Sequence, residues 1–480
     1  MSDRPNVVFL LSDQLRRDVL PLYGGTQIET PNIDRLAAEG VTLDQCVSTC
    51  PVCTPYRGML MTGRHPQTTG VVINSTRTRH SEIGLADVFA HHGYRTGYVG
   101  KWHLHTGAWP ANNVPDWVPR GRARLGWQYW RGYNQHMVYN DGFVHSPDQD
   151  FDVIRWNGYE TDGLWAFGRE FLQQNDQRPY FLLLSPQQPH AGLPKDGLMA
   201  PKRFYDRVPL RPTFPANVPD DMERGDASDV ESLVGRMRNY LAMTLAIDEM
   251  LGNVMDELER RGELDNTLFV LTSDHGTMGA SHGYTVWNKK LPYREAMDVP
   301  MVMRLPGVLD GGRRCDTLTA PVDLMPSLCG LCGIDAPRTV EGLDLSQAWR
   351  GQRGGPEQEA VFCMNFGKRT DYYVDGNEWR GVRTKRWQYT RWLDGRAELY
   401  DLETDPLQQD NRAGSAETHE TETMLEKQLK AFQAQRGDEM MPGSAYASWV
   451  DEQRRVIRNG YGPLCHPEAE PDWSLLTPVG

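Results

Sequence analysis

Five short apolar runs constrain the fold of this chain more than any other feature of its sequence. They cover residues 7–11, 94–99, 180–184, 268–272 and 299–304. Each run has the length of a buried strand, and the stretches between the runs are long enough for crossover helices. This rhythm predicts an α/β fold in which a large, mainly parallel or mixed sheet is sandwiched by helices.

The length of the chain and a change in composition predict a second, smaller unit. A chain of 480 residues exceeds the usual size of one compact core. After the glycine-rich segment 351–356 the sequence changes to short strand-like runs and a charged helix around residues 420–435. We therefore predict a larger domain over residues 1–356 and a C-terminal α+β subdomain with an extended tail over residues 357–480.

The larger domain contains one clear helix and one long aperiodic region. Over residues 240–261 apolar side chains recur at spacings of three and four, and Gly262 follows as a stop. Residues 105–160 are rich in Trp, Tyr, Asn, Gly and Arg without a clear period. This composition predicts long loops over the sheet, where the walls of binding sites are often built.

The charge and hydropathy of the chain exclude several classes of partner. Its formal net charge is -13, from 51 basic and 64 acidic residues, which argues against nucleic acid and anionic membranes as partners. No apolar stretch has the length needed to cross a bilayer. The N-terminal apolar run reads as a buried strand and not as a signal peptide, which predicts a cytoplasmic protein whose eight cysteines stay mostly reduced.

The segment around Cys53 carries the local signals of a short helix. Thr54 is the predicted N-cap, Pro55 the first helical residue and Gly63 the stop. Cys53 would then lie at a helix N-terminus, where unpaired N–H groups favour an anion and Arg57 adds a positive charge one turn away. These features alone are explained equally well by a buried cysteine before an ordinary helix.

Polar residues follow several of the predicted strands. Asp13 and Gln14 follow the first strand, and Asp274 and His275 follow the fourth. Carboxylates at the carboxyl ends of neighbouring parallel strands face one crevice, and together with an amide oxygen they suit Ca²⁺ or Mg²⁺. The alternative is that both segments are ordinary loop caps.

Three further side chains are predicted at the same edge of the sheet. Lys101 and His103 follow the second strand and stand two residues apart, so they project toward one side. His190 follows the third strand shortly after its end. A lysine and a histidine at this spacing are otherwise common on protein surfaces.

The pattern Cys53-x-Pro55-x-Arg57, followed by Thr62-Gly63, resembles the signature of the sulfatase family within the alkaline phosphatase superfamily. The string from Gly100 to Leu104 and the Ser-Asp-His-Gly segment around Asp274 are similar to other family motifs, and the resemblance runs nearly end to end. It implies an alkaline phosphatase-like fold with a smaller C-terminal antiparallel sheet and a packed helix. That arrangement agrees with the boundary predicted near residue 356.

The resemblance implies that Cys53 is oxidised to formylglycine by a formylglycine-generating enzyme. The hydrated aldehyde offers two hydroxyls at one carbon, of which one attacks sulfur and the other expels sulfate as the aldehyde re-forms. Asp13, Gln14, Asp274 and His275 would hold one divalent metal together with residue 53. Ca²⁺ is the expected ion, with Mg²⁺ or Mn²⁺ as alternatives, because many members have aspartate and asparagine in place of Gln14 and His275.

The resemblance also implies roles for the remaining side chains. Arg57 would stabilise the ionised nucleophile after Asp274 accepts its proton, and Lys101 would bind the nucleophile or sulfate oxygens. His103 would remove the proton that lets sulfate leave. His190 and Lys289 would contact sulfate and the bridging oxygen, and one of them would protonate the leaving alkoxide. The neighbouring Lys290 is the alternative to Lys289.

The chain is accordingly predicted to be a sulfuric ester hydrolase, a sulfatase for a small sulfated substrate, either a carbohydrate or an aryl or alkyl sulfate. The tail could contribute to a homo-oligomer. A phosphonate monoester or phosphodiester hydrolase is the alternative enzyme, and an inactive binding protein is the alternative if Cys53 stays unconverted. A four-thiolate zinc site from Cys46, Cys50 or Cys53 with Cys329 and Cys332 is disfavoured, because buried thiols pack well in apolar segments.

Overall fold

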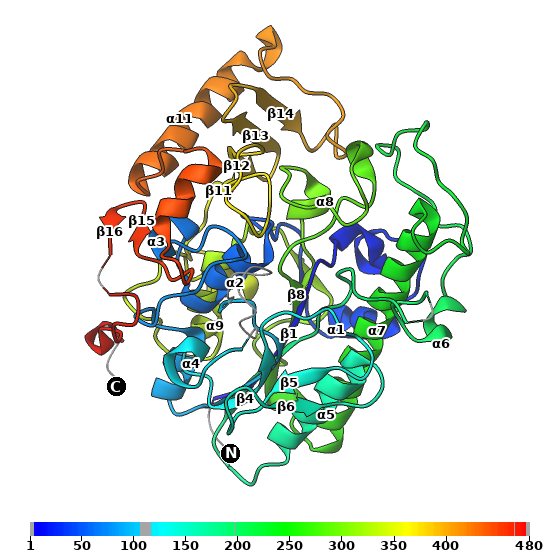
Figure 1. The fold of residues 1–480 in the computed structure, drawn as a ribbon, viewed down its shortest axis with the longest axis vertical. Helices are drawn as coiled ribbons and strands as arrows, with labels where there is room; N and C mark the ends of the chain where they lie inside the picture. Colours follow the sequence, from blue (N-terminus) through cyan, green and yellow to red (C-terminus); the bar gives the residue numbers. More distant parts are fainter. Residues whose placement is uncertain (1–3, 106–116, 196, 465, 477–480) are drawn as a thin grey trace.

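A computed structural model describes residues 4–105, 117–195, 197–464 and 466–476 and is built around one eight-stranded sheet (Figure 1). The sheet has the order β10 (Arg313–Cys315), β2 (Val41–Leu43), β9 (Met301–Arg304), β8 (Thr267–Ser273), β1 (Asn6–Ser12), β7 (Tyr180–Ser185), β3 (Arg95–Lys101), β4 (Tyr129–Tyr133). Neighbouring strands run parallel except around β9, which is antiparallel to both β2 and β8. The predicted mixed α/β sheet is confirmed, and all five apolar runs contribute strands to it.

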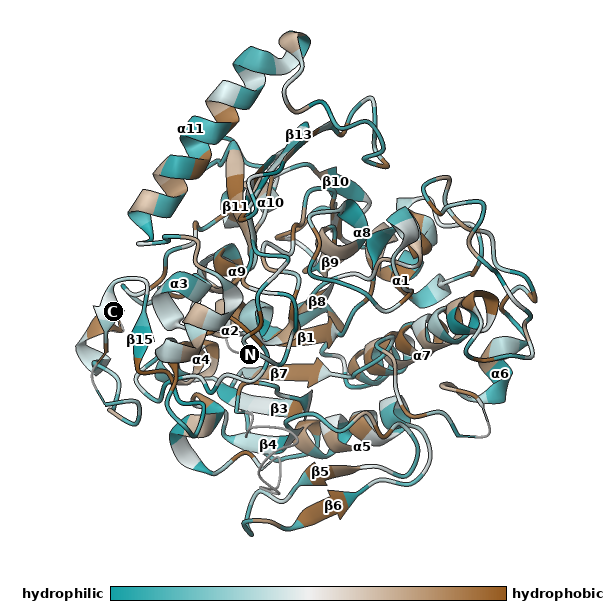
Figure 2. Cartoon of the chain, turned by 45° about the horizontal axis from the view of Figure 1, so that its top comes forward, coloured by the Kyte–Doolittle hydropathy of each residue, from teal (hydrophilic) through white to brown (hydrophobic). Residues whose placement is uncertain are grey.

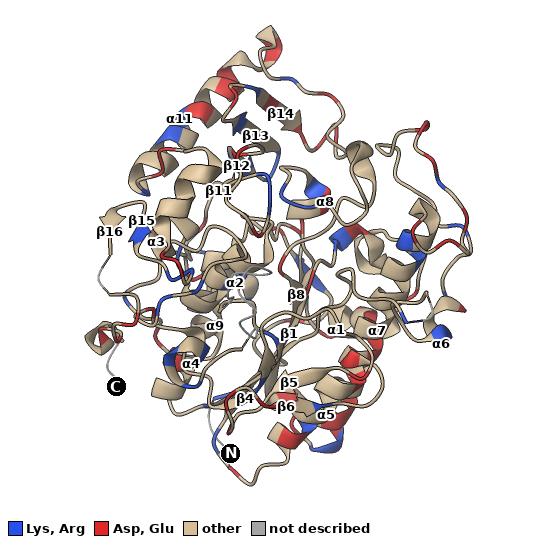
Figure 3. Cartoon of the chain, viewed as in Figure 1, with Lys and Arg blue, Asp and Glu red and all other residues tan. Residues whose placement is uncertain are grey.

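The central strands are hydrophobic on both faces because helices cover both. β1 and β8 carry no charged residue, and every residue of β8 is buried. Figure 2 shows β1 and β7 as brown, hydrophobic strands, whereas Figure 3 shows Lys, Arg, Asp and Glu concentrated on outer elements such as α11 (His419–Gln435). Strands that are buried on both faces read as continuous apolar runs, and this made them recognisable in the sequence.

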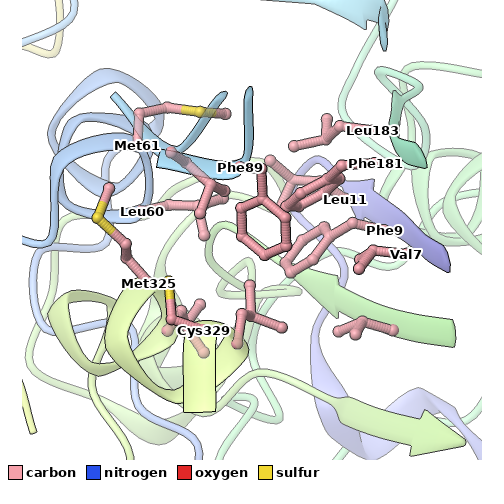
Figure 4. Packing of buried hydrophobic residues seen from close by; sticks show 14 of the residues in the cluster. Val7, Phe9, Leu11, Leu60, Met61, Phe89, Phe181, Leu183, Met325 and Cys329 are labelled. Atoms are coloured by element: carbon pink, nitrogen blue, oxygen red, sulfur yellow. The ribbon is translucent and has the colours of Figure 1, made fainter. Parts of the chain in front are cut away.

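One face of the sheet packs against α2 (Cys53–Thr62), α4 (Leu85–His91) and α9 (Pro321–Leu331). Figure 4 shows this core, in which Phe89 of α4 lies beside Phe9 of β1 and Phe181 of β7. The rings of Phe89 and Phe181 meet edge to face with centroids 4.6 Å apart. This arrangement is favourable for aromatic pairs and fixes the position of the helices relative to the strands.

The other face packs against α1 (Pro31–Ala38), α5 (Glu160–Leu172) and α7 (Leu233–Arg260). α7 begins seven residues before the predicted start at residue 240. Ser232 is its N-cap and accepts a hydrogen bond from the Gly235 N–H over 3.0 Å. Two additional turns therefore form ahead of the periodic segment that the sequence shows clearly.

The C-terminal region forms a four-stranded antiparallel sheet of β11 (Ala360–Asn365), β12 (Trp379–Thr384), β13 (Trp387–Trp392) and β14 (Ala397–Asp401), against which α11 packs. One hydrophobic cluster contains Val47 and Met297 from the larger part together with Trp379 and Leu425 from this region. The boundary at residue 356 stays a prediction, since the two sheets share this core.

The remaining elements are short. They are η1 (Arg17–Val19), η2 (Pro21–Tyr23), α3 (Pro66–Thr69), η3 (Gly121–Arg124), β5 (Phe143–His145), β6 (Val153–Arg155), α6 (Lys202–Tyr205), η4 (Leu264–Asn266), η5 (Ser281–Gly283), α8 (Arg294–Met297), α10 (Ser346–Trp349), η6 (Ala416–Thr418), η7 (Gly443–Trp449), β15 (Arg458–Asn459), β16 (Gly462–Pro463) and η8 (Trp473–Leu475). The region 105–160, predicted as loops, contains β4, β5 and β6, and its residues 106–116 lie outside the described part. No helix in the described ranges is both long and apolar enough to span a membrane.

Candidate active site

The carboxyl ends of β1 and β8 bring two carboxylates together. Asp13 follows β1 and Asp274 follows β8, and the last residues of these parallel strands, Ser12 and Ser273, are register partners. The Asp274 N–H donates to the Ser12 carbonyl oxygen over 3.2 Å. The Gln14 N–H donates to Oδ1 of Asp274 over 3.0 Å, so the two strand ends are tied to each other.

Side chains from two more strands reach the same edge of the sheet. Lys101 is the last residue of β3, and its Nζ pairs with a carboxylate oxygen of Asp13. His103 follows two residues later with a φ of 58°. His190 follows β7, after the cis peptide bond between Gln188 and Pro189. The site is therefore assembled from the ends of four neighbouring strands.

Cys53 is the first residue of α2, and Val52, not Thr54, is its N-cap. The helix begins two residues earlier than the sequence predicts, because the extended backbone of Val52 already turns the chain into the helix. Thr54 lies within the first turn, where its hydroxyl donates to the His103 carbonyl oxygen over 2.7 Å. Gly63 ends the helix in the left-handed region, with a φ of 67°, as predicted.

The Cys53 thiol lies among charged groups and is 1% exposed. Its Sγ is 3.2 Å from Nε2 of His275, 3.2 Å from Nζ of Lys289 and 3.8 Å from Oδ1 of Asp13. Burial raises the pKa of the Cys53 thiol, and the charge of Asp13 raises it further, against the lowering effect of Lys101 and Lys289. The unmodified residue is therefore held as a thiol and not as the thiolate that a nucleophilic cysteine requires.

Four metal-binding side chains meet around this point. Their ligand atoms all lie within 4.8 Å of one another, and they belong to Asp13, Cys53, Asp274 and His275. Nδ1 of His275 is 2.8 Å from the Gly276 carbonyl oxygen, which assigns the proton to Nδ1 and leaves the Nε2 lone pair toward the other ligands. Burial lowers the pKa of His275 to about 4, so its ring is neutral, as a metal ligand must be.

Gln14 completes this donor set with its amide oxygen. Its Nε2 donates to Oγ1 of Thr277 over 2.8 Å and to the Trp287 carbonyl oxygen over 3.0 Å. Oε1 consequently faces the site and accepts from Nζ of Lys289 over 3.3 Å. Two carboxylates, an amide oxygen and a neutral imidazole suit a divalent cation, so the residues present fit a metal.

Arg57 balances the negative charge from the other side. Its Nε lies 3.2 Å from Oδ2 of Asp274, and its Nη1 donates to the Lys101 carbonyl oxygen and to Oγ of Ser185, each over 2.8 Å. Burial alone would raise the pKa of Asp13, but Lys101 and the other nearby cations hold it well below its usual value. The carboxylates of Asp13 and Asp274 therefore lie next to positively charged side chains.

The two histidines outside the metal set are neutral. Neither ring nitrogen of the fully buried His103 has a hydrogen-bond partner among the described residues. Burial, together with the charge of Lys101, lowers the pKa of His103 well below its usual value. Burial and the charge of Lys289 do the same for His190, whose Nδ1 is 2.7 Å from the Ala191 carbonyl oxygen. Both rings can accept a proton.

The structure brings all the predicted site residues to one edge of the sheet and decides between the two adjacent lysines. Lys289 contacts Cys53, whereas Nζ of Lys290 donates to the Lys368 carbonyl oxygen. Cys46 and Cys329 lie in a hydrophobic cluster, and the only metal-donor group found within the described residues is the one around Cys53.

Several residues that support the site were missed. Ser48 donates to the Asp274 carbonyl oxygen over 2.6 Å, and Tyr240 of α7 donates to the Gln14 carbonyl oxygen over 2.8 Å. Ser185, which Arg57 contacts, ends β7, and its position at a strand end was a signal that the sequence did offer. Ser48 and Tyr240 act through tertiary contacts alone, for which the sequence holds no local pattern.

Residues 5–334 match the model of the family described as "Sulfatase". The chain belongs to the sulfatase family. Residues 281–435 of this sulfatase also match the C-terminal region of N-sulphoglucosamine sulphohydrolase. Its fold and its relatives make it a type I sulfatase of the alkaline phosphatase superfamily and therefore a sulfuric ester hydrolase.

The sulfatase is similar to curated relatives over most of its length. It is 31% identical over 448 residues to the ulvan-active sulfatase of Formosa agariphila, a match that covers 92% of this chain and 84% of the relative. It is 25% identical to the N-acetylglucosamine-6-O-sulfatase of Bacteroides thetaiotaomicron, with 91% of this chain and 87% of the relative covered.

Solved structures share the fold. A protein solved in complex with its substrate D-glucosamine-2-N,6-O-disulfate matches with a TM-score of 0.75 and 23% identity, over 92% of this chain and 99% of the other. The phosphonate monoester hydrolase of Agrobacterium radiobacter matches with a TM-score of 0.69 and 21% identity, over 96% and 99%. The fold alone therefore does not separate sulfate from phosphonate esters.

Proposed function

We propose that this sulfatase removes a sulfate group from a carbohydrate and that formylglycine made from Cys53 is its nucleophile. The observation that carries the proposal is the Cys53 thiol, which is buried and uncharged yet lies at the meeting point of metal donors and cations. The ulvan-active sulfatase and the N-acetylglucosamine-6-O-sulfatase are carbohydrate sulfatases by name, which supports the substrate class.

Formylglycine supplies the geminal hydroxyls that allow both attack on sulfur and later release of sulfate. We propose that a formylglycine-generating enzyme makes it. The role of the surrounding residues is to hold this group in place. Nε2 of His275 and Nζ of Lys289 both lie 3.2 Å from Sγ of Cys53, the atom that formylglycine replaces with oxygen.

A bound divalent cation supplies a positive charge that polarises sulfate oxygens and favours the ionised nucleophile. Asp13, Gln14, Asp274 and His275 would hold it, together with residue 53. We propose Ca²⁺ because most of these donors are oxygens, and the nitrogen donor of His275 keeps Mg²⁺ and Mn²⁺ as the alternatives.

The charged residues divide the remaining work. Arg57 and Lys101, each fixed by a carboxylate, offset the charge that develops on the sulfate oxygens. Neutral His103 accepts the proton whose removal releases sulfate. Burial leaves His190 neutral as well, so we assign protonation of the leaving alkoxide to Lys289.

Mass spectrometry of the peptide that contains Cys53 tests the nucleophile. We expect the mass of formylglycine in place of cysteine. Cys53→Ala should lower kcat/KM on an aryl sulfate by at least about 10³-fold. Cys50→Ala, which removes a buried thiol three residues away, is the matched control and should retain activity. Full activity of Cys53→Ala would overturn the proposal.

A comparison of hydrolysis rates tests whether the enzyme prefers sulfate esters or phosphonate monoesters. We expect kcat/KM for an aryl sulfate to exceed that for the matched aryl phosphonate monoester. The opposite order would assign the chain to phosphonate hydrolysis.

Elemental analysis of the purified protein should find about one divalent ion per chain.

A further inference from the structure

A group of cations borders the active site without taking part in the chemistry proposed above. It consists of Lys290, Lys368, Arg369 and Arg454, and we name it the basic rim. Lys290 follows Lys289, and its φ of 73° lies in the left-handed region that non-glycine residues rarely adopt. This turn sends Lys289 toward Cys53 and lets Nζ of Lys290 donate to the Lys368 carbonyl oxygen over 2.5 Å.

The loop that carries Lys368 and Arg369 is connected to the start of the Cys53 helix through Asn74. Figure 1 shows this loop, in yellow between β11 and β12, reaching down toward α2. The Asn74 N–H donates to the Thr370 carbonyl oxygen over 2.8 Å, and Oδ1 of the same asparagine accepts from the Thr54 N–H over 3.1 Å. One residue therefore connects the start of α2 to the loop of the C-terminal region.

Arg454 joins the rim from the C-terminal tail. Its guanidinium carbon lies 5.2 Å from the centre of the Tyr373 ring, within the range of a cation–π contact. The Tyr373 hydroxyl is 3.3 Å from Oγ1 of Thr76, on the segment that also contains Asn74. The tail, the loop and the Lys290 turn thus converge beside the same end of α2.

Two acidic residues of the same loop accept backbone hydrogen bonds: Asp375 from the Ser444 N–H over 2.8 Å and Glu378 from the Gly443 N–H over 2.6 Å. Burial lowers the pKa of Lys290 to about 8, and the charges of Lys289 and Arg369 add to this effect, whereas Asp371 opposes it. Four cations gathered at one place in a chain with a net charge of -13 indicate a place that receives an anion.

We propose that the basic rim is a second anion subsite, which binds a sulfate or carboxylate group on the sugar next to the one whose sulfate ester is hydrolysed. The inference rests on the proposed carbohydrate sulfatase function and narrows its substrate to polyanionic carbohydrates. Lys290 is next to Lys289 in sequence, and Asn74 connects the loop of Lys368 and Arg369 to Thr54, so the proposal places the neighbouring sugar at the rim while its partner occupies the active site.

Binding is best measured by calorimetry on the full-length protein with metal, in which Cys53→Ala prevents turnover. Three disaccharides serve as probes: one with a single sulfate, one with two sulfates and one with a sulfate and a uronate carboxylate. The rim variant combines Lys290→Met with Arg369→Gln. The matched control combines Lys430→Met with Arg396→Gln, which removes two exposed cations elsewhere in the C-terminal region.

We expect at least one dianionic probe to bind about tenfold more tightly than the monosulfated probe, the gain of one charged hydrogen bond. The rim variant should reduce this advantage to less than about twofold and leave binding of the monosulfated probe unchanged, whereas the control should retain the advantage. The probe that loses affinity identifies sulfate or carboxylate as the bound group. An advantage that persists in the rim variant, or equal binding of all three probes, would overturn the subsite.

Hydrolysis of an aryl sulfate by the unmutated enzyme separates this result from the proposed function. Loss of that hydrolysis with an intact rim effect would count against the chemistry at Cys53 alone. Normal hydrolysis without a rim effect would count against the subsite alone.

Discussion

Arg57 of α2 connects the helix to the ends of three strands and places a positive charge beside the two carboxylates of the site. It is fully buried, it contacts Asp274, and it donates to the Lys101 carbonyl oxygen and to Ser185. Arg57→Ala would leave two buried carboxylates without this partner, so we expect a loss of about 3–5 kcal/mol in the free energy of unfolding. The fall in melting temperature measures it.

Arg57→Lys separates charge from geometry. A lysine keeps the charge but cannot make the forked contacts to Asp274, Lys101 and Ser185 at once. We expect a smaller fall in melting temperature than in Arg57→Ala, with kcat/KM still reduced by about 10²-fold or more. Equal activity of Arg57→Lys and the parent enzyme would show that a positive charge at this position is sufficient for activity and that the guanidinium fork is not required.

Glu160 gives the stability of the protein a dependence on pH. It is fully buried, it accepts from the Tyr133 hydroxyl and the Gln187 N–H, and burial raises its pKa to about 7. In the unfolded chain the carboxyl ionises near pH 4.5, so its contribution to stability is complete below that pH and is lost as the pH rises through 7. The loss amounts to roughly 3 kcal/mol.

Glu160→Gln tests this dependence. Between pH 5 and pH 8 the melting temperature of the variant should fall less than that of the parent protein. Parallel curves for the two proteins would show that Glu160 is not the group responsible.

The sequence predicted the site residues unequally. Cys53, Asp13 and Asp274 were identifiable because strand ends and a helix start are local patterns. Lys289 was preferred to Lys290 through the family resemblance alone, because the left-handed backbone conformation at Lys290 is not revealed by sequence spacing. Thr54 was misplaced because the helix begins directly after Val52, which makes no side-chain cap hydrogen bond and so leaves no capping signal in the sequence.

At the scale of the elements, the end of α2 is defined by one glycine. Gly63 has a φ of 67°, and a Cβ added there would lie 2.8 Å from Cγ1 of Val340. We expect Gly63→Ala to reduce the free energy of unfolding by about 1–2 kcal/mol or more, through backbone strain and the close contact. Gly58→Ala, in the same helix, meets only an ordinary contact of 3.5 Å with Val71 and should not lower the melting temperature.

Elements buried on both faces were the easiest to predict. All five apolar runs form strands, because a strand covered by helices on both sides has no polar face to interrupt it. The first turns of α7 were missed, since Leu233 and Val234 precede the regular spacing and are stabilised by tertiary packing. The antiparallel direction of β9 has no signature in its own residues.

At the scale of the molecule, a buried ion pair attaches the C-terminal tail. Arg380 of β12 donates to Asp438 over 2.5 and 3.0 Å and to the Tyr446 hydroxyl over 2.8 Å, and Gln67 of α3 donates to the same carboxylate over 2.7 Å. We expect Asp438→Ala to reduce the free energy of unfolding by about 3–5 kcal/mol. Asp394→Ala, which breaks an exposed pair with Arg396, should change it by less than about 1 kcal/mol.

Metal binding should also stabilise the whole fold, because the donors come from two strands and a helix. We expect a chelator to lower the melting temperature and Ca²⁺ to restore it. When Ca²⁺ is present at a hundred times its dissociation constant, it should add about 3 kcal/mol to the free energy of unfolding. Asp274→Asn should weaken this response. A melting temperature that ignores both chelator and metal would argue against a site at these residues.

The burial of α2 sets an order of events for the newly made chain. Every residue from Cys53 to Thr62 is buried, and the thiol is 1% exposed. A modifying enzyme that must surround this segment has no access to it once the sheet and its covering helices have closed. The proposed oxidation of Cys53 would therefore compete with folding, and chains that fold first would keep an unmodified cysteine. The fraction of converted chains would then depend on the relative rates of modification and folding and not on an equilibrium.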